Sequence, residues 1–382
     1  MKKIISVTTG TRAEYGILRP ILKKIHNSKN LELILIVTGT HNLKKFGNTV
    51  NEIKKDGFKI YSNFTLIPKN DSNYEMAISV GDGIKKFAKI FKKIKPDINL
   101  ILGDRDESLA SAIAAYHMNI PNAHIHGGDK SKAGIDEYNR HAITKISNIH
   151  LVATKLSKKR VIKMGENPKF VFLTGSPSID EVNERYLTSC KKLENKYKIN
   201  FKDGVIILLQ HSVTTETNLS KKQILITLKV LEKLKTQTIV IMPNSDPGSR
   251  TIYNEIRKNK IKNKYLKIFS SIPRQDYLGL LKWSSLLIGN SSSGIIEASR
   301  FKIPVLNLGI RQEDRERGEN VFDEKIFDEK KILKKVNKIL KMDKSKFKKS
   351  NIYGNGRSSE KIIKILESLE INEQLIQKKI YY

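Results

Sequence analysis

The sequence predicts an α/β protein built from two doubly wound domains, and three observations lead to this fold class. The 382 residues exceed what one ordinary hydrophobic core supports, so two domains are expected. Short apolar runs alternate with stretches of helical spacing, and the near-continuous apolar character of the runs is typical of parallel strands covered on both faces. A polar stretch beyond residue 177 separates two such series, which indicates two Rossmann-like domains with a cleft between them.

The first series lies before residue 177. It opens with a β-rich run at 4–9 that Gly10 ends, and the apolar residues from Ile17 to Ile25 then recur at helical spacing. Five more runs in this half are predicted strands: 31–37, 99–102, 122–125, 149–153 and 170–173. We therefore expect residues 1–177 to form the N-terminal domain.

The second series starts after a polar stretch that runs to Phe201. Its predicted strands are 205–209, 238–242, 266–269, 285–288 and 304–308. Helices are expected at 224–234, after Asp328 to about residue 340, and around an apolar stripe at 362–369. Residues 178–382 are thus expected to form the C-terminal domain, with a last helix that packs back on the N-terminal one.

The composition excludes several classes of protein. The net charge is +32, but lysines supply most of it and are spread over nearly every predicted helix, whereas a nucleic-acid interface would cluster its charge and use more arginine. We therefore expect no nucleic-acid partner, but an attraction for small anions. Cys190 is the one cysteine, so an intrachain disulfide is excluded. The apolar runs are too short for a signal peptide or a membrane span, which predicts a soluble, cytoplasmic protein without a membrane partner.

The most informative motifs are three blocks rich in acids and imidazoles, at 102–107, 124–129 and 136–141. Two of them directly follow predicted strands. Residues just beyond the carboxyl ends of parallel strands converge on one crevice, so these side chains are expected to meet at one site. General acid and base catalysis needs groups of different proton affinity at one place.

Two histidines stand out within these blocks. His124 and His126 lie two apart on a strand-like run, so their side chains are expected to face the same way. With Asp104 and Asp129 they could form a metal site, but patterns such as H-E-x-x-H or paired cysteines are missing, and no metal is expected. A core histidine is the best alternative for His124. The glycines at 127–128 are expected to leave room for a substrate to approach His126.

A glycine turn at 10–16 joins a predicted strand to a helix. It lacks the G-x-G-x-x-G spacing of dinucleotide-binding folds and the Gly-Lys-Ser/Thr of a P-loop. Backbone donors at the helix start, together with Arg12, could hold a phosphate. The alternative is a plain tight turn with Arg12 in a surface ion pair.

A second glycine turn, Gly-Asn-Ser-Ser-Ser-Gly at 289–294, follows the predicted strand 285–288 and starts a helix. Three hydroxyls and two glycines at a helix start are typical of a diphosphate cradle. Glu297 lies about one turn further on, where its carboxylate could accept bonds from ribose hydroxyls. Ordinary serine capping is the alternative, but it would explain only one of the serines.

His211 follows the predicted strand 205–209 and occupies in the second domain the place that the turn at 10–16 has in the first. At a strand end that faces the cleft it could contact phosphate. A structural histidine is an equally good interpretation.

Six motifs together resemble those of the hydrolysing UDP-N-acetylglucosamine 2-epimerases of sialic acid biosynthesis. In order, from Lys3 to about Pro304, they are Thr-Arg-Ala-Glu-Tyr-Gly, Leu-Gly-Asp-Arg-x-Glu, His-Ile-x-Gly-Gly, Asp-Glu-x-x-Arg-His-x-Ile-Thr-Lys, Gly-Ser-Pro and Gly-Asn-Ser-Ser-Ser-Gly. The resemblance implies the fold of type B glycosyltransferases, with a sugar-binding and catalytic N-terminal domain and a nucleotide-binding C-terminal domain. It also implies a UDP-sugar substrate, UDP as product, a homodimer or homotetramer, and neither metal nor NAD as cofactor.

The resemblance also implies roles for single residues. Asp104 and Asp136 match the family's catalytic carboxylates. His126 stands where many members have an acid, in His-Ile-Glu-Gly-Gly, and imidazole can still transfer protons at neutral pH, so it is the third expected catalytic residue. The residues expected to bind the sugar or its nucleotide are Arg12, Glu14, Asp129, Arg140, His211, Asn290, Ser291, Ser292, Ser293, Gly294 and Glu297.

The implied reaction converts UDP-N-acetylglucosamine and water to N-acetylmannosamine and UDP, through a 2-acetamidoglucal. Relatives of the same branch act instead on a UDP- or GDP-linked 2,4-diacetamido-2,4,6-trideoxyglucose on the route to legionaminic acid. A non-hydrolysing epimerase is a further alternative, a glycosyltransferase is disfavoured by the acid cluster, and a nucleic-acid-binding protein would explain the charge but none of the motifs.

Overall fold

The computed structural model describes residues 2–70, 72–182 and 186–382, which form two compact units. Unit 1 takes the chain up to Lys130, then Asp136–Glu181 and Ile352–Tyr382. Unit 2 takes Ser131–Ile135 and Val182–Asn351. The chain therefore leaves unit 1 beyond the expected boundary at residue 177, and its last thirty or so residues return to unit 1.

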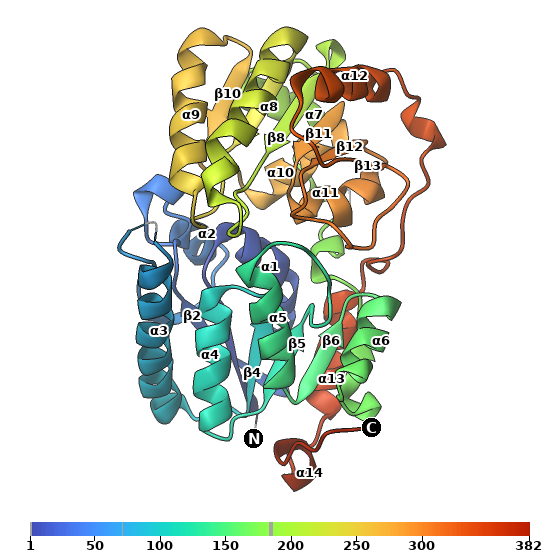
Figure 1. The fold of residues 1–382 in the computed structure, drawn as a ribbon. Helices are drawn as coiled ribbons and strands as arrows, with labels where there is room; N and C mark the ends of the chain where they lie inside the picture. The colour runs from blue at the N-terminus through green and yellow to red at the C-terminus, as the bar shows by residue number, and fades with distance from the viewer. Residues whose placement is uncertain (1, 71, 183–185) are drawn as a thin grey trace. The chain divides into compact units, whose positions relative to one another are not determined.

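Unit 1 is built on a sheet of seven parallel strands in the order β3-β2-β1-β4-β5-β6-β7 (Figure 1). The strands are β1 (Lys3–Thr9), β2 (Leu31–Val37), β3 (Ile60–Asn63), β4 (Ile98–Leu102), β5 (Asn122–Ile125), β6 (Ile149–Val152) and β7 (Val171–Leu173). Strand order reverses between β1 and β4. Ligands of doubly wound sheets bind outside the carboxyl ends of the strands at such a point.

Helices cover both faces of this sheet. One face carries α1 (Arg12–His26), α2 (Val50–Lys55) and α13 (Ser358–Ser368), and the other carries α3 (Asn73–Ile94), α4 (Asp106–His117), α5 (Ile135–Lys145) and α6 (Lys155–Lys163). The pleat of the strands sorts the core between the two faces. Leu35 and Val37 pack with α1, while Ile36 between them packs with α3 and α4.

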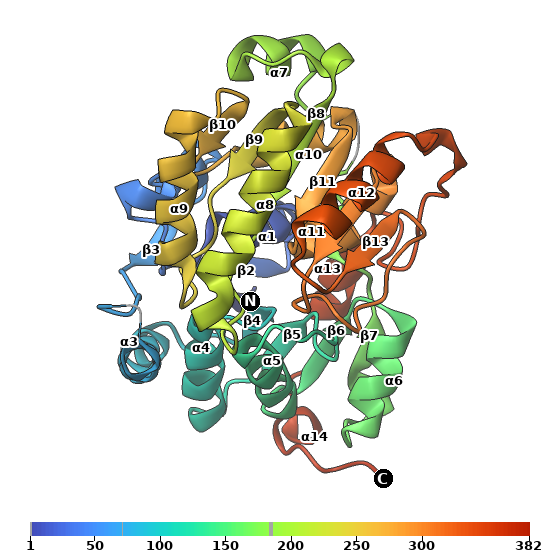
Figure 2. The same cartoon turned by 45° about the horizontal axis from the view of Figure 1, so that its top comes forward.

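Unit 2 repeats the plan with six parallel strands in the order β10-β9-β8-β11-β12-β13 (Figure 2). The strands are β8 (Val205–Leu209), β9 (Gln237–Ile241), β10 (Leu266–Phe269), β11 (Leu286–Gly289), β12 (Val305–Leu308) and β13 (Val321–Glu324). One face carries α7 (Cys190–Tyr197) and α10 (Arg274–Trp283), and the other carries α8 (Ser220–Leu234), α9 (Ser249–Lys262) and α12 (Glu329–Leu340). Strand order reverses between β8 and β11.

The predicted α/β class is therefore confirmed, and four predicted strands, β2, β5, β8 and β10, have the predicted bounds. The sequence reading missed β3 and β13, which both lie at sheet edges. Each is only four residues long and partly exposed, so polar residues interrupt the apolar run that identified the other strands. None of the helices formed by the described residues has the length and apolar character that crossing a bilayer requires.

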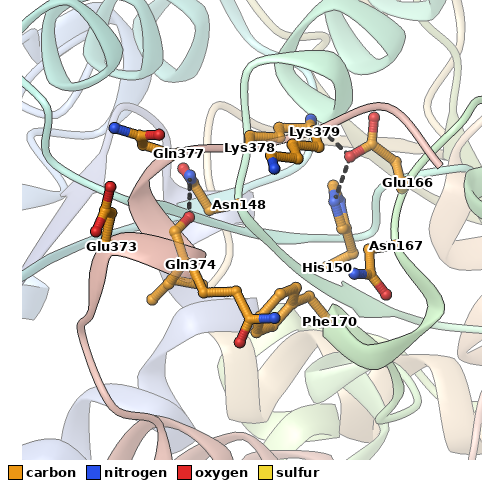
Figure 3. Close-up of a pocket in the computed structure, with 11 residues that line it drawn as sticks. Asn148, His150, Glu166, Asn167, Phe170, Glu373, Gln374, Gln377, Lys378 and Lys379 are labelled. Atoms are coloured by element: carbon orange, nitrogen blue, oxygen red, sulfur yellow. Dashed lines mark hydrogen bonds and ion pairs between the residues drawn. The ribbon is translucent and has the colours of Figure 1, made fainter.

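A buried ion cluster ties the C-terminal segment around α14 (Glu373–Ile376) to the amino-terminal end of β6 (Figure 3). The Glu166 side chain is 1% exposed and accepts bonds from Lys145 Nζ at 2.8 Å and His150 Nε2 at 3.0 Å, while Lys378 Nζ lies 2.6 Å from its Oε2. Burial alone would raise the pKa of Glu166, but these three partners lower it by more, to about 2. The cluster borders a cavity of about 440 Å³ at the sheet end opposite the carboxyl ends of the strands.

We expect Glu166→Gln to reduce the free energy of unfolding by about 2 to 3 kcal/mol at pH 7, because it leaves the buried end of Lys378 without its carboxylate. A carboxyl group with a lowered pKa stabilises the folded state above its ordinary pKa and loses this effect as the pH falls. The difference between the wild type and the variant should therefore shrink from about pH 5 towards pH 2.

Urea denaturation at several pH values measures this difference. Glu373→Gln is the matched control, since Glu373 borders the same cavity but is exposed, and its substitution should cost less than about 0.5 kcal/mol. An equal, pH-independent loss in both variants would contradict the role of the cluster.

Candidate active site

In each unit the residues singled out from the sequence follow the two strands at which the strand order reverses. In unit 1 the turn at 10–14 follows β1 and Asp104 follows β4, with His126 after the neighbouring β5. In unit 2 His211 follows β8 and the turn at 289–297 follows β11. The separate motifs of the sequence thus follow the carboxyl ends of the central strands in each sheet, which is where doubly wound folds bind ligands.

The interior of the unit 1 site is organised by Arg140, whose side chain is 2% exposed. Its guanidinium forms ion pairs with Asp104 and Glu137, and Nη1 donates to the carbonyl oxygen of Asp129 at 3.2 Å. Burial lowers the pKa of Arg140, but the neighbouring carboxylates raise it by more, so the group remains a cation. We expected Arg140 to bind substrate. In the structure its buried guanidinium is paired with Asp104 and fixes the position of that carboxylate.

The same helix brings Asp136 to this place. α5 contacts the loop after β4 through Arg140 and Asp104, and also through Asn139, whose Nδ2 donates to Asp106 Oδ1 at 2.9 Å. Asp136 lies in the first turn of α5, one turn before these contacts. Asp104 and Asp136 are both partly exposed, so each of the two elements that Arg140 joins carries a partly exposed carboxylate.

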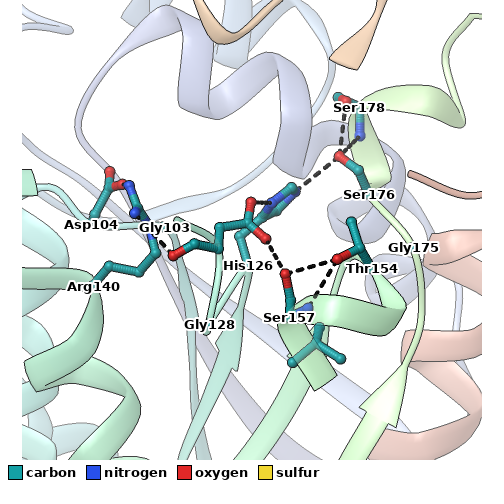
Figure 4. A network of polar contacts seen from close by, with 12 residues as sticks. Gly103, Asp104, His126, Gly128, Arg140, Thr154, Ser157, Gly175, Ser176 and Ser178 are labelled. Atoms are coloured by element: carbon teal, nitrogen blue, oxygen red, sulfur yellow. Dashed lines mark hydrogen bonds and ion pairs between the residues drawn. The ribbon is translucent and has the colours of Figure 1, made fainter. Parts of the chain in front are cut away.

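His126 lies just beyond the end of β5, with φ at +67°. The alternation of side-chain direction along a strand therefore does not apply to it. His126 and His124, which were expected to face the same way, have different partners. The Nδ1 of His126 lies 2.9 Å from Asp129 Oδ2, and its Nε2 lies 2.9 Å from Ser176 Oγ (Figure 4). The ring is 10% exposed, and both nitrogens are bonded within unit 1.

His124 is a core histidine, the alternative that the sequence favoured for it. It is fully buried, its Nε2 lies 2.7 Å from the carbonyl oxygen of Gly103, and burial lowers its pKa to about 3. A Cβ atom on Gly127 would lie 2.9 Å from His124 Nδ1, and one on Gly128 would lie 2.7 Å from the Ser157 carbonyl oxygen. The two glycines therefore let the chain pack closely against its own core.

Asp129, expected to contact the substrate, is 3% exposed. Its Oδ1 accepts a bond from Ser157 Oγ at 2.8 Å, and its Oδ2 faces His126. Both carboxylate oxygens are thus engaged by side chains of unit 1.

The turn after β1 begins α1 in the manner of a capping box. The Thr11 hydroxyl accepts from Glu14 N, and Glu14 Oε2 accepts from Gly10 N at 2.6 Å. Glu14 is 6% exposed, and burial, with Glu107 nearby, raises its pKa to about 7. Glu14 therefore braces the turn, and Thr-x-x-Glu is the sequence signal that identifies this role. Arg12, the first residue of α1, is partly exposed.

In unit 2 the two central strand ends are joined through Asn290. Its Oδ1 accepts from His211 N at 2.7 Å and its Nδ2 donates to the His211 carbonyl oxygen at 2.9 Å. Arg311 and Gln312 donate to the Asn290 carbonyl oxygen at 3.3 and 3.1 Å. Asn290 thus fixes the backbone on which His211 and the serine turn are mounted.

The serine turn depends on close backbone approaches. Gly289 has φ at +132°, and a Cβ atom there would lie 2.1 Å from the Leu209 carbonyl oxygen. A Cβ atom on Gly294 would lie 2.9 Å from Val305 Cγ1, so this glycine lets α11 (Ser292–Ile296) pack directly on β12. Ser291 caps α11 by accepting from Ser293 N, while Ser292 is partly exposed.

Glu297 is 3% exposed and held on both sides. Arg274 donates to its Oε1, and Ser293 Oγ donates to its Oε2 at 2.5 Å, with Tyr277 OH against the same hydroxyl. The sequence reading missed Arg274 and Tyr277. They lie on α10, before the strand that carries the motif, and no local pattern marks them.

The described residues contain no group of three or more His, Cys, Asp or Glu side chains arranged to hold a metal ion. What unit 1 offers is carboxylate and imidazole groups on a rigid frame, which suits proton transfer. What unit 2 offers is a serine-rich turn at the start of a short helix, which suits an anion.

Comparisons with known proteins identify the family of the chain. The family model of UDP-N-acetylglucosamine 2-epimerase matches residues 23–367. A hydrolysing UDP-N,N'-diacetylbacillosamine 2-epimerase of Legionella pneumophila is 39% identical over 379 residues, 99% of each chain, and a hydrolysing GDP/UDP-N,N'-diacetylbacillosamine 2-epimerase of Campylobacter jejuni is 35% identical over 329 residues, 86% of this chain and 85% of the other. The crystal structure of UDP-GlcNAc 2-epimerase from Neisseria meningitidis bound to UDP-GlcNAc matches with a TM-score of 0.79 at 20% identity, covering 95% of this chain and 99% of the other. This likeness confirms the type B glycosyltransferase fold.

Proposed function

This chain belongs to the UDP-N-acetylglucosamine 2-epimerase family, and we propose that within it the protein is a hydrolysing 2-epimerase of UDP-N,N'-diacetylbacillosamine. That substrate is UDP-linked 2,4-diacetamido-2,4,6-trideoxyglucose. Similarity to the Legionella enzyme along 99% of both chains supports it, and the Campylobacter relative acts on the same sugar. It takes precedence over UDP-N-acetylglucosamine for sialic acid synthesis, which the motifs first suggested.

One observation carries the reaction type. The buried Arg140 fixes Asp104 at the carboxyl end of β4, and the same helix presents Asp136 from its first turn. Inversion at C2 of such a sugar needs a base to remove the C2 proton on one face and an acid to return a proton on the other. Two partly exposed carboxylates on separate elements provide such a pair.

The first half of the proposed reaction is an elimination. A carboxylate takes the C2 proton, the electron pair of the C2–H bond forms the C1–C2 double bond, and the C1–O bond breaks with its electrons leaving on UDP. The products are UDP and a 2-acetamidoglycal. Asp104, Asp136 and His126 are the groups that we assign to proton transfer.

The second half is a hydration. Water adds its oxygen to C1 of the glycal and gives up one proton to a basic group of the site, while the electron pair of the double bond takes a proton at C2 on the face opposite to the one that lost it. The product is free 2,4-diacetamido-2,4,6-trideoxymannose. Addition of water at C1, in place of UDP, is what distinguishes the hydrolysing reaction from the reversible one.

The unit 2 residues are assigned to the UDP moiety. The turn at 291–294 is proposed to bind the diphosphate, because charge-assisted bonds stabilise the negative charge that the leaving group gains. Arg12, at the start of α1, is separately proposed as a cation for phosphate. Glu297 is proposed to accept a bond from a ribose hydroxyl, since a carboxylate has acceptor capacity beyond its bonds to Arg274 and Ser293.

UDP-N-acetylglucosamine is the second candidate substrate, favoured by the description of the matching family model. Proton NMR of parallel incubations separates the two. We expect UDP-N,N'-diacetylbacillosamine to give free UDP and the free manno sugar with kcat/KM at least about 10-fold above that for UDP-N-acetylglucosamine, the discrimination that one buried substituent can supply. A higher kcat/KM for UDP-N-acetylglucosamine would reverse the assignment, and a nucleotide-linked epimer without free UDP would show the non-hydrolysing reaction.

We expect Asp104→Asn and Asp136→Asn each to lower kcat by about 100-fold or more, since an amide cannot take the proton. UDP affinity should change little, and wild-type product formed in D₂O should carry deuterium at C2. Asp106→Asn is the matched control at the start of α4, next to this loop, and should retain most activity. If either variant of Asp104 or Asp136 turns over normally, that residue has no part in proton transfer.

We expect Ser292→Ala to weaken UDP binding several-fold and Arg12→Ala to weaken it more, because a charge-assisted bond to phosphate is lost. Titration calorimetry with UDP measures both. Ser299→Ala serves as the control, because its hydroxyl bonds the carbonyl oxygen of Ile296 behind the turn. Unchanged UDP affinity in both test variants would remove the diphosphate from this turn.

A further inference from the structure

The His126 ring is the middle of a chain of polar side chains that the proposed reaction does not by itself explain (Figure 4). Asp129 Oδ2 lies on one side of the ring, 2.9 Å from Nδ1, and Ser176 Oγ lies on the other, 2.9 Å from Nε2. Behind Asp129, Ser157 Oγ donates to Oδ1 at 2.8 Å, and Thr154 Oγ1 donates to Ser157 Oγ at 3.0 Å. All five residues are buried, and Ser176 is completely so.

The donor and acceptor roles along this chain are fixed by chemistry. A carboxylate accepts hydrogen bonds and donates none, so the ring nitrogen facing Asp129 must carry a proton. In a neutral imidazole the other nitrogen is then an acceptor, and Ser176 donates to Nε2. The chain therefore selects one tautomer of His126, with hydrogen on Nδ1.

The backbone of His126 shows that this side chain is held in place against a conformational preference. A φ of +67° costs a non-glycine residue about 1 kcal/mol or more, and the ring bonds to Asp129 and Ser176 offset that cost. Gly128 has φ at +72° and packs on the Ser157 carbonyl, so the whole turn is pressed against α6. The ring therefore has little freedom to reorient.

We infer that Asp129 is a positioning residue for the proposed epimerase reaction, whose carboxylate holds His126 in the Nδ1–H tautomer so that Nε2 is the nitrogen able to accept a proton. This inference rests on the proposed function. It replaces the substrate contact that the sequence suggested for Asp129.

The two ring bonds differ in how easily they can be released. The bond to Asp129 is charge-assisted, and the acid is itself fixed by Ser157. The Ser176 hydroxyl has another partner, Ser178 Oγ, at 2.9 Å. A hydroxyl can rotate towards that partner without moving the backbone, which would free Nε2 while Nδ1 stays held.

The backbone of Asp129 is also bonded to Arg140. Its carbonyl oxygen accepts from Arg140, which holds Asp104. Asp129→Asn keeps this backbone bond but removes a carboxylate whose charge also acts on Arg140, so its effect on His126 is read from the tautomer and not from turnover alone.

The test is Asp129→Asn, read out by ¹⁵N NMR of histidine-labelled protein at about pH 9, well above the ordinary imidazole pKa range. His126→Gln identifies the His126 signals by their disappearance. In the wild type we expect hydrogen on Nδ1. In Asp129→Asn we expect hydrogen on Nε2, since the amide oxygen is taken by Ser157 and the amide nitrogen then donates to Nδ1. In the same variant kcat should fall about 100-fold with KM changed less than about 3-fold, as in other sites where a positioning carboxylate is replaced.

Ser176→Ala is the matched control, since it removes the bond on the other side of the ring and should keep the Nδ1–H tautomer. Ser157→Ala is the second variant and covers the case that Asp129→Asn does not fold: it should keep the tautomer but lower kcat several-fold at constant KM. Hydrogen on Nε2 in the wild type, or an unchanged tautomer in Asp129→Asn, would overturn the inference. The NMR result does not depend on turnover, so a wild type inactive on every nucleotide sugar would refute the proposed function and leave the positioning question answered.

Discussion

The burial of one guanidinium group is the constraint on which the rest of the unit 1 site depends. The Arg140 side chain is almost completely buried, and a buried cation is tolerated only where acceptors surround it. Asp104, Glu137 and the Asp129 carbonyl supply them from the loop after β4, from α5 itself and from the turn after β5. Three separate elements must therefore meet at Arg140. If any one of these elements were misplaced, the buried cation would lose an acceptor. Alternative arrangements of the three elements are therefore strongly disfavoured.

The sequence predicts the fold well because the fold rests on local patterns. Buried parallel strands are continuous apolar runs, and four of the predicted ones have the observed bounds. Helix starts also leave local marks, such as Asp328, whose side chain accepts from Lys331 N at the start of α12. The edge strands β3 and β13 lack such a pattern, because one side of each is exposed and polar residues are tolerated there.

The same local reasoning is weaker for the division of labour within the site. It predicts which residues lie at strand ends, but not which of them are turned inwards. Asp129, Arg140 and Glu14 were all expected to contact substrate, and all three are buried as supports. Their burial is decided by partners far along the chain, such as Asp104 for Arg140, 36 residues away. Only Glu14 had a local signal, the capping box with Thr11. In a site of this kind a motif residue can serve by holding its neighbour, and the linear sequence does not distinguish that role from binding.

The path of the chain explains why the support of His126 extends to the C-terminal residues. Ser176, the partner of its Nε2, donates its backbone N–H to the Tyr353 carbonyl oxygen at 2.8 Å. A few residues later Asp180 accepts the N–H groups of Ser358 and Ser359, which begin α13, at 2.9 and 2.6 Å. The segment leaving unit 1 is thus bonded to the segment that returns to it. α13 in turn covers the apolar face of α1, so a chain ending before Ile352 would uncover that face and also loosen the backbone that carries Ser176. Unit 1 is therefore complete only with both segments, and the geometry of its histidine depends on residues that the linear order places in the second half of the protein.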